Sequence, residues 1–129
     1  MPKSVLVVDD DAIVRQMLCC VLTLEADFAV CGEAENGRDA IEKAQALRPD
    51  VILMDLSMPV MNGIEATSAL KMLMPMVPVI IFSDYNDVFS EKEALSAGIT
   101  LVPKSENLSV LIDRVRALCS IPLPRDSSV

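Results

Sequence analysis

Five short runs of apolar residues, rich in Val and Ile, alternate along this chain with longer segments in which apolar residues recur at helical spacing. This alternation is typical of repeated strand–helix units, which build a parallel sheet with helices on its two faces. The crossover connections in such sheets are right-handed, which restricts the topology severely. The expected strands span residues 4–8, 28–33, 51–54, 79–82 and 99–102. The sequence therefore predicts one α/β domain with a doubly wound sheet of five parallel strands.

Five helices are expected between and after these strands. The first three are indicated by apolar residues at helical spacing, which are Ile13, Met17, Leu18, Val21 and Leu22, then Ile41, Ala44 and Leu47, then Ile64, Thr67, Leu70 and Leu73. The fourth is expected over residues 88–97, with Gly98 at its end. The fifth follows Asn107, a suitable N-cap, and its apolar face comprises Leu108, Leu111, Ile112, Val115 and Leu118.

Composition excludes several kinds of partner and chemistry. The formal net charge is −8, whereas nucleic acids and anionic membranes are bound by clustered Lys and Arg. No apolar run approaches the roughly 20 residues that a membrane-spanning helix needs. The four cysteines lack metal-ligand spacing, and the chain has no histidine. A histidine that carries or transfers a phosphoryl group would therefore belong to a partner.

Polar residues follow four of the expected strands. Asp9 and Asp10 follow the first strand, Asp55 the third, Ser83 the fourth and Lys104 the fifth. Function in doubly wound sheets sits at the carboxyl ends of the strands, so these side chains are expected to converge on one pocket. Three neighbouring carboxylates repel one another, and a divalent cation is the natural reason to keep them together. Mg²⁺ fits best because it takes oxygen ligands and pairs carboxylates with phosphate.

These motifs resemble those of the receiver domains of bacterial two-component response regulators, over a segment from about Lys3 to Leu118. The motifs that carry the resemblance are Val-Asp-Asp-Asp at 8–11, Met-Asp-Leu-Ser-Met-Pro at 54–59, Asn62-Gly63, Ile-Ile-Phe-Ser at 80–83 and Pro103-Lys104. The resemblance implies a flavodoxin-like sheet with strand order 2-1-3-4-5, five helices and a cytoplasmic location. Residues 1–120 are then expected to form the receiver domain, and residues 121–129 a linker or frayed end.

The resemblance also implies roles for individual residues. Asp55 corresponds to the phosphoacceptor, a carboxylate nucleophile that forms an acyl phosphate. Asp10 and Asp55 would bind Mg²⁺ directly, Asp9 would do so through water, and the backbone carbonyl of Ser57 would complete the protein ligands. Lys104 would supply a second cation to the phosphoryl group. Asp11 is expected to be structural, at the start of a helix.

The implied function is that of a phosphorylation-controlled switch. Ser83 would donate its hydroxyl to a phosphoryl oxygen, and movement would reach the face made by the fourth helix, the fifth strand and the fifth helix. The implied partner is a sensor histidine kinase or a phosphotransfer protein. The chain would be a phosphoacceptor with self-catalysed transfer and dephosphorylation rather than an enzyme proper. A C-terminal helix-turn-helix output domain outside this chain is a further implied partner, and any homodimer is expected to use helices near the fourth and fifth units.

Three departures from the family pattern keep a rival function open. Leu101 stands where the family usually has an aromatic switch residue, Ser105 where Pro is common, and Asp84 where a small residue is preferred. The rival is a pseudo-receiver, a protein-interaction module that does not turn over phosphate. An aspartyl phosphatase is disfavoured because Ser57 occupies the place of its second acid. A flavin binder is disfavoured because Asp9 to Asp11 would repel the flavin phosphate.

Overall fold

The computed structural model describes residues 2–56, 58–83, 100–104 and 107–119. Nine elements lie in these ranges, in the order β1 Lys3–Val8, α1 Ala12–Thr23, β2 Phe28–Ala34, α2 Gly37–Leu47, β3 Val51–Met54, α3 Gly63–Leu73, β4 Val79–Ser83, β5 Thr100–Pro103 and α5 Leu108–Leu118. The helix expected over 88–97 and the tail expected over 121–129 lie outside the described residues.

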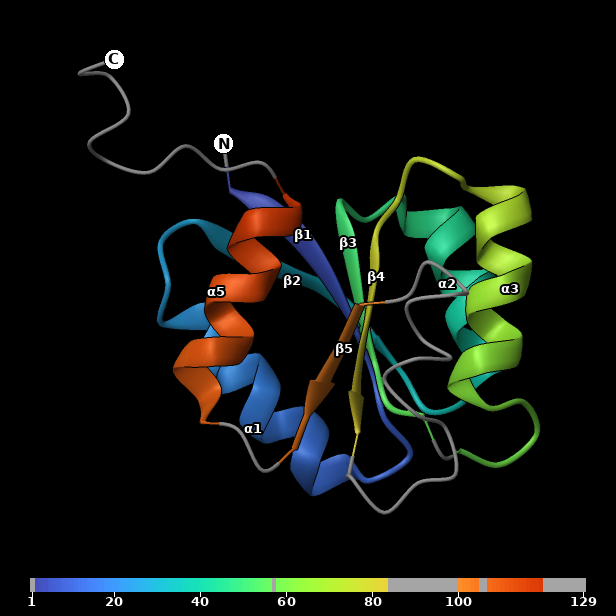
Figure 1. Cartoon of the computed structure of the whole chain (residues 1–129), viewed down its shortest axis with the longest axis horizontal. Helices are drawn as coiled ribbons and strands as arrows, with labels where there is room; N and C mark the ends of the chain where they lie inside the picture. Colours follow the sequence, from blue (N-terminus) through green and yellow to red (C-terminus); the bar gives the residue numbers. More distant parts are fainter. Residues whose placement is uncertain (1, 57, 84–99, 105–106, 120–129) are drawn as a thin grey trace.

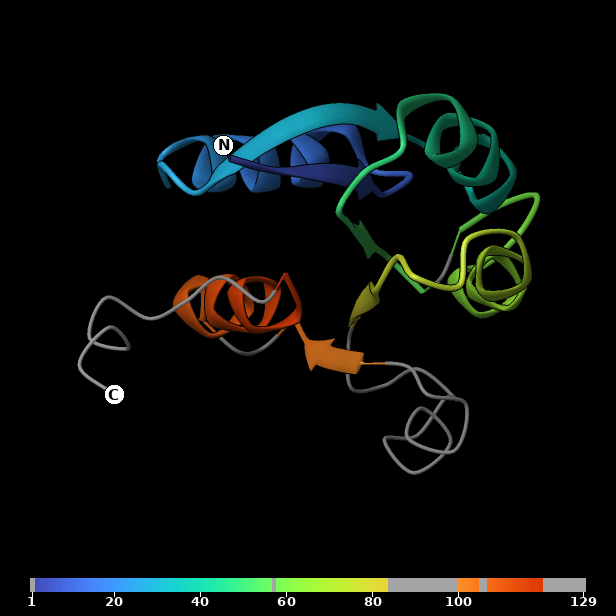
Figure 2. The same ribbon diagram turned by 90° about the horizontal axis from the view of Figure 1, so that it is seen from above.

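The five strands form one parallel sheet in the order β2-β1-β3-β4-β5. This order confirms the doubly wound, flavodoxin-like topology predicted from the sequence. Figure 1 shows α1 and α5 on one side of the sheet and α2 and α3 on the other, and Figure 2 shows the same division from above. Among the described residues, no helix combines the length and the apolar character that crossing a membrane requires.

Alternate residues of the central strands face the two helical layers. In β1, Leu6 and Val8 pack in the cluster under α2 and α3, whereas Val5 and Val7 pack in the cluster under α1 and α5. Strands β3 and β4 alternate in the same way. A strand buried on both faces has an uninterrupted apolar sequence because both sets of side chains need apolar neighbours. This accounts for the runs from which the strands were predicted.

The apolar residues that indicated α1 in the sequence lie on more than one side of the helix. Leu18 and Leu22 are buried against the sheet, but Ile13 is 77% exposed and Met17 is 43% exposed. Ile13 and Met17, which helped to indicate this helix in the sequence, therefore do not lie on its core-facing side. Helical spacing groups residues on one side of a helix, but α1 has apolar residues on two sides, and spacing alone does not tell which side meets the sheet.

Gly63, the first residue of α3, brings this helix against the backbone of Asp55. A Cβ atom at position 63 would lie 2.4 Å from the Asp55 carbonyl oxygen. We expect Gly63→Ala to lower the free energy of unfolding by about 1–3 kcal/mol because a backbone atom must move to make room. Urea denaturation measures this loss. Gly32→Ala is the matched control, since the close contact of its Cβ would be with the flexible end of the Leu47 side chain rather than with backbone. An equal loss of stability there would contradict the account.

Candidate phosphoacceptor and metal site

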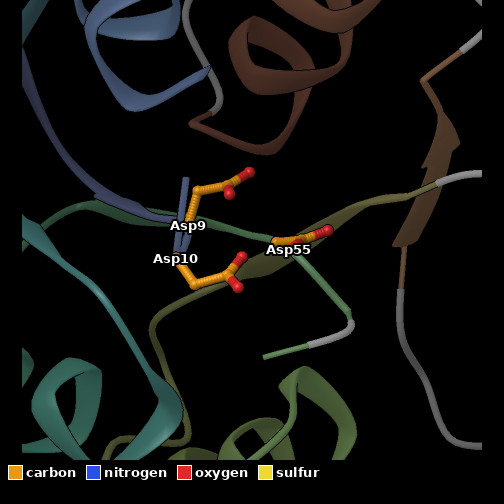
Figure 3. A group of neighbouring side chains, drawn as sticks. All are labelled: Asp9, Asp10 and Asp55. Atoms are coloured by element: carbon orange, nitrogen blue, oxygen red, sulfur yellow. The ribbon is translucent and has the colours of Figure 1, made fainter. Parts of the chain in front are cut away.

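Three carboxylates meet at the carboxyl edge of the sheet. Asp9 and Asp10 directly follow β1, and Asp55 directly follows β3. One oxygen from each lies within 4.8 Å of the other two, and Figure 3 shows the three side chains grouped there. Asp9 is 1% exposed and Asp55 is 8% exposed, whereas Asp10 is exposed. The cluster predicted from strand order therefore exists, with two members buried and one open to solvent.

Sheet pairing holds these acidic residues together. Strands β1 and β3 are neighbours, and Val8 is paired with Met54 at their ends. The ladder continues one step further, because the Asp55 N–H donates to the Val8 carbonyl over 2.9 Å. The Asp9 N–H donates to the Ala34 carbonyl of β2 over 3.0 Å. The positions of Asp9 and Asp55 thus follow from backbone bonds rather than from contacts between their side chains.

Lys104 supplies the positive charge of the site. It is the first residue after β5, and its Nζ lies 3.2 Å from Asp55 Oδ1 and 3.7 Å from Asp9 Oδ2. The side chain of Lys104 is 25% exposed, so these ion pairs are partly shielded from water. The structure therefore brings Lys104 to the cluster, as the sequence predicts.

Burial makes the charged forms of both inner carboxylates costly. The pKa of Asp55 is raised to about 6, first because the group is buried and second because Asp9 is nearby, while Lys104 opposes the shift. Burial also raises the pKa of Asp9, against the opposing effects of the Asp11 N–H and of Lys104. The Lys104 ammonium group pairs with two of the three carboxylates, so these four residues together carry a net negative charge when all are ionised. This excess of negative charge on oxygen ligands suits a hard divalent cation.

Arg15 supports the site, although the sequence analysis did not single it out. Its Nη1 donates to the Asp9 carbonyl over 2.6 Å, and its Nε lies 3.1 Å from Glu33 Oε1 on β2. Asp11, expected to be structural, is the N-cap of α1 and accepts from the N–H groups of Ile13 and Val14. Arg15 is the one charged residue of α1. The sequence signal that could have identified Arg15 is its charge, because every other residue of this helix is uncharged.

Two further residues named from the sequence, Ser83 and Leu101, lie on neighbouring strands. Ser83 is the last residue of β4, and its backbone is paired with that of Pro103 in β5. Leu101 lies in β5, half-buried against the cluster under α2 and α3. Three further residues, the candidate metal ligand Ser57 and the two departures from the family pattern at Asp84 and Ser105, lie outside the described residues.

A family model, that of the response regulator receiver domain, matches residues 5–116. The chain belongs to this family. Receiver domains are the phosphoacceptors of two-component signalling, and Mg²⁺ binding at an acidic pocket is typical of them. In this receiver domain that pocket is the cluster of Asp9, Asp10 and Asp55.

Relatives of this receiver domain differ in length. It is 38% identical to the response regulator protein VraR of Staphylococcus saprophyticus over 90% of this chain, but this covers only 56% of VraR. It is 43% identical to the chemotaxis protein CheY of Thermotoga maritima over 76% of this chain and 81% of that protein. A solved complex of CheX, CheY, BeF3 and Mg from Borrelia burgdorferi matches with a TM-score of 0.83 and 26% identity, over 92% of this chain and 90% of the other. The receiver domain thus spans about half of VraR and most of this CheY.

Proposed function

We propose that this receiver domain accepts a phosphoryl group on Asp55 in a Mg²⁺-dependent reaction and thereby switches a signalling surface. The observation that carries the proposal is the position of Lys104 Nζ, 3.2 Å from Asp55 Oδ1, at a cluster of three carboxylates. This arrangement combines a carboxylate nucleophile, oxygen ligands for a cation and a fixed ammonium group. Phosphoryl transfer needs these parts because its catalysis depends on positioning and on offsetting oxygen charge.

The proposed roles divide between metal binding and contacts with the phosphoryl group. Asp10 and Asp55 would bind Mg²⁺ directly, Asp9 would bind it through water, and the Ser57 carbonyl would complete the protein ligands. Mg²⁺ bound there would offset negative charge on the phosphoryl oxygens. Lys104 and the Ser83 hydroxyl then bond the oxygens of the phosphorylated form.

The transfer itself balances as a simple substitution at phosphorus. An oxygen of the Asp55 carboxylate attacks the phosphorus, and an O–P bond forms while the bond between phosphorus and the donor breaks. The leaving group keeps the electron pair of that bond, and Asp55 becomes an acyl phosphate. Water later attacks the same phosphorus, which releases inorganic phosphate and restores the carboxylate. The nucleophile is the ionised form of Asp55, and with a pKa of about 6 the group is mostly ionised near neutral pH.

The proposed donor is a phosphohistidine of a sensor histidine kinase or a phosphotransfer protein. This chain has no histidine, so the phosphorylated imidazole belongs to the partner. The proposed output is the surface near β5 and α5, because Lys104 lies at the end of β5 and responds directly to a new phosphoryl charge. A helix-turn-helix output domain outside this chain would bind DNA, since a net charge of −8 makes this chain a poor partner for phosphate backbones.

The test is intact-mass spectrometry after incubation with acetyl phosphate, with Mg²⁺ or with EDTA. We expect one phosphoryl adduct with Mg²⁺ and none with EDTA. Asp55→Asn should give no adduct. Asp50→Asn is the matched control for that variant and should leave the adduct unchanged, because the exposed Asp50 carboxylate binds Ser4 at the other end of β1. No adduct with acetyl phosphate or with phosphoramidate would contradict the proposal and favour the pseudo-receiver.

A further inference from the structure

A side chain from α1 holds the peptide that joins two of the three acidic residues. Strand β1 ends at Val8, and the Asp9 N–H continues the ladder with a bond to the Ala34 carbonyl of β2. The next backbone group, the Asp9 carbonyl, accepts from Arg15 Nη1 over 2.6 Å. This carbonyl belongs to the peptide between Asp9 and Asp10. A guanidinium group thus supports the backbone directly beyond the end of the strand.

The direction of the Asp10 side chain depends on this peptide. Asp10 is the exposed member of the acidic cluster (Figure 3). The other two carboxylates have partners, because Asp9 and Asp55 are both paired with Lys104. In the part of the chain that the structure describes, no hydrogen bond or ion pair reaches the Asp10 carboxylate. Its direction therefore follows from its backbone, since the orientation of the preceding planar peptide determines where the side chain points.

Glu33 of β2 holds Arg15 in turn. Glu33 Oε1 lies 3.1 Å from Arg15 Nε, and the Arg15 side chain is only 18% exposed. Because the guanidinium group is planar, a bond at Nε determines the direction in which Nη1 donates. Glu33 also directly precedes Ala34, whose carbonyl accepts from the Asp9 N–H. The end of β2 therefore supports Asp9 on both sides, once directly and once through Arg15.

We propose that Arg15 is a positioning residue of the Mg²⁺ site, which holds the peptide before Asp10, and that Glu33 keeps Arg15 in the orientation this requires. The inference rests on the proposed function, in which Asp10 and Asp55 are direct ligands of Mg²⁺. Residues that contact the ligands rather than the metal typically change metal affinity by about 10- to 100-fold when they are removed. The site should therefore bind Mg²⁺ well only while this support is intact.

The charge of Arg15 and its geometry lead to opposite expectations. A cation near a metal site repels the metal, so the loss of its charge alone would strengthen Mg²⁺ binding. Loss of the bond to the Asp9 carbonyl would instead weaken Mg²⁺ binding, because Asp10 would then be ordered at the expense of the binding energy. Lys104 rather than Arg15 is the cation that opposes the raised pKa of Asp9 and of Asp55. We therefore expect the geometric effect to be the larger one.

Isothermal titration calorimetry with Mg²⁺ tests the proposal. Arg15→Met should bind Mg²⁺ at least about tenfold more weakly than the wild type. Arg15→Lys keeps the charge but lacks the planar fork that reaches both partners, and it should also bind more weakly. Arg114→Met is the matched control, because it removes the same charge from an exposed site on α5, and its affinity should match the wild type. Wild-type or stronger binding by Arg15→Met, or full affinity in Arg15→Lys, would overturn the proposal.

A destabilised variant distinguishes positioning from a general loss of structure. Val115 is fully buried in the cluster under α1 and α5. Val115→Ala should lower the Tm through lost packing, yet it should bind Mg²⁺ as the wild type does at a temperature where both are folded. A loss of affinity in Val115→Ala equal to that in Arg15→Met would mean that lowered stability accounts for both, and positioning would be refuted.

A double-mutant cycle tests the part played by Glu33. Glu33→Ala should weaken Mg²⁺ binding because Arg15 loses the partner of its Nε. In the Arg15→Met background the same change should have little further effect, since the two residues act through one contact. The loss of a negative charge would by itself weaken binding equally in both backgrounds. Additive effects would therefore overturn the role assigned to Glu33.

A metal-free measurement separates this inference from the proposed function. The Asp11 N–H donates to Asp9 Oδ1 over 2.9 Å. Its exchange with solvent in EDTA, measured by NMR, should be about tenfold faster in Arg15→Met than in the wild type or Arg114→Met, because the preceding peptide is no longer held. A wild type that does not bind Mg²⁺ would overturn the proposed function and this inference with it. A wild type that binds Mg²⁺, with an Arg15→Met variant equal to it in affinity and in exchange, would overturn the positioning role alone.

Discussion

Asp55→Asn is expected to stabilise the metal-free protein near neutral pH while abolishing its phosphorylation. The Asp55 carboxylate is buried beside Asp9, and its pKa is raised to about 6. Its charge therefore destabilises the folded state, by at most about 3 kcal/mol. We expect the variant to gain about 1–3 kcal/mol in the free energy of unfolding. Urea denaturation in EDTA measures the gain, and intact mass after acetyl phosphate measures the loss of the adduct.

The pH dependence follows from the direction of the shift. In the unfolded chain Asp55 has an ordinary pKa of about 4, so between about pH 4 and 6 the folded state binds its proton more tightly. The destabilisation caused by the Asp55 charge is complete above about pH 6 and is lost as the pH falls toward 4. The free energy of unfolding of the metal-free wild type should therefore increase as the pH is lowered from 7.5 to 5. This increase in stability should be smaller in Asp55→Asn, where only the raised pKa of Asp9 remains to produce it.

Mg²⁺ and a surface variant provide the controls for this result. Mg²⁺ should stabilise the wild type more than Asp55→Asn, because binding to the folded state alone adds to stability and the variant lacks one ligand. Asp113→Asn, which removes an exposed carboxylate on α5, should change stability by less than about 0.5 kcal/mol. A less stable Asp55→Asn with the pH dependence of the wild type would contradict this account of the cluster.

Lys104→Met is expected to slow phosphorylation by acetyl phosphate about 100-fold or more while increasing the affinity for Mg²⁺. The rate falls because the ammonium group 3.2 Å from Asp55 Oδ1 no longer offsets charge in the transition state. The affinity rises because Lys104 competes with the metal for the carboxylates of Asp9 and Asp55. Quenched-flow labelling measures the rate, and isothermal titration calorimetry measures Mg²⁺ binding.

These opposite changes separate an electrostatic role from a loss of folding. A misfolded variant would lose both the rate and the metal affinity. Lys3→Met is the matched control, because Lys3 is the first residue of β1 and lies at the opposite end of this strand from the cluster. It should leave both quantities unchanged. A Lys104→Met protein that is phosphorylated at the wild-type rate would remove Lys104 from the proposed mechanism.

The strands and the acidic cluster could be predicted because buried parallel strands have strong sequence signals. Strand β3 was expected over residues 51–54 and spans Val51–Met54. The other four begin or end within one residue of the expected limits. Once the strand ends were located, parallel topology was enough to bring Asp9, Asp10, Asp55 and Lys104 together. Side chains at strand ends are well predicted because the backbone ladder determines where they lie.

Helix faces and supporting contacts were predicted less well. The helix α1 has two apolar sides, and only packing determines that Leu18 rather than Met17 meets the sheet. The contact between Arg15 and the Asp9 carbonyl depends on how α1 sits over the end of β1, which residue spacing does not specify. The exposure of Ile13 and Met17 could not be predicted for the same reason, because burial is a property of the folded chain and not of the helical pattern.

The most direct test of the central claim is chemical identification of the phosphorylated residue. Borohydride reduces an aspartyl phosphate to homoserine, and trypsin releases residues 44–71, which contain both Asp50 and Asp55, in one peptide. After acetyl phosphate and Mg²⁺, fragmentation of this peptide should locate homoserine at position 55 alone, and EDTA during labelling should prevent its formation. Homoserine at another position, or its formation at position 55 without a divalent cation, would contradict the account.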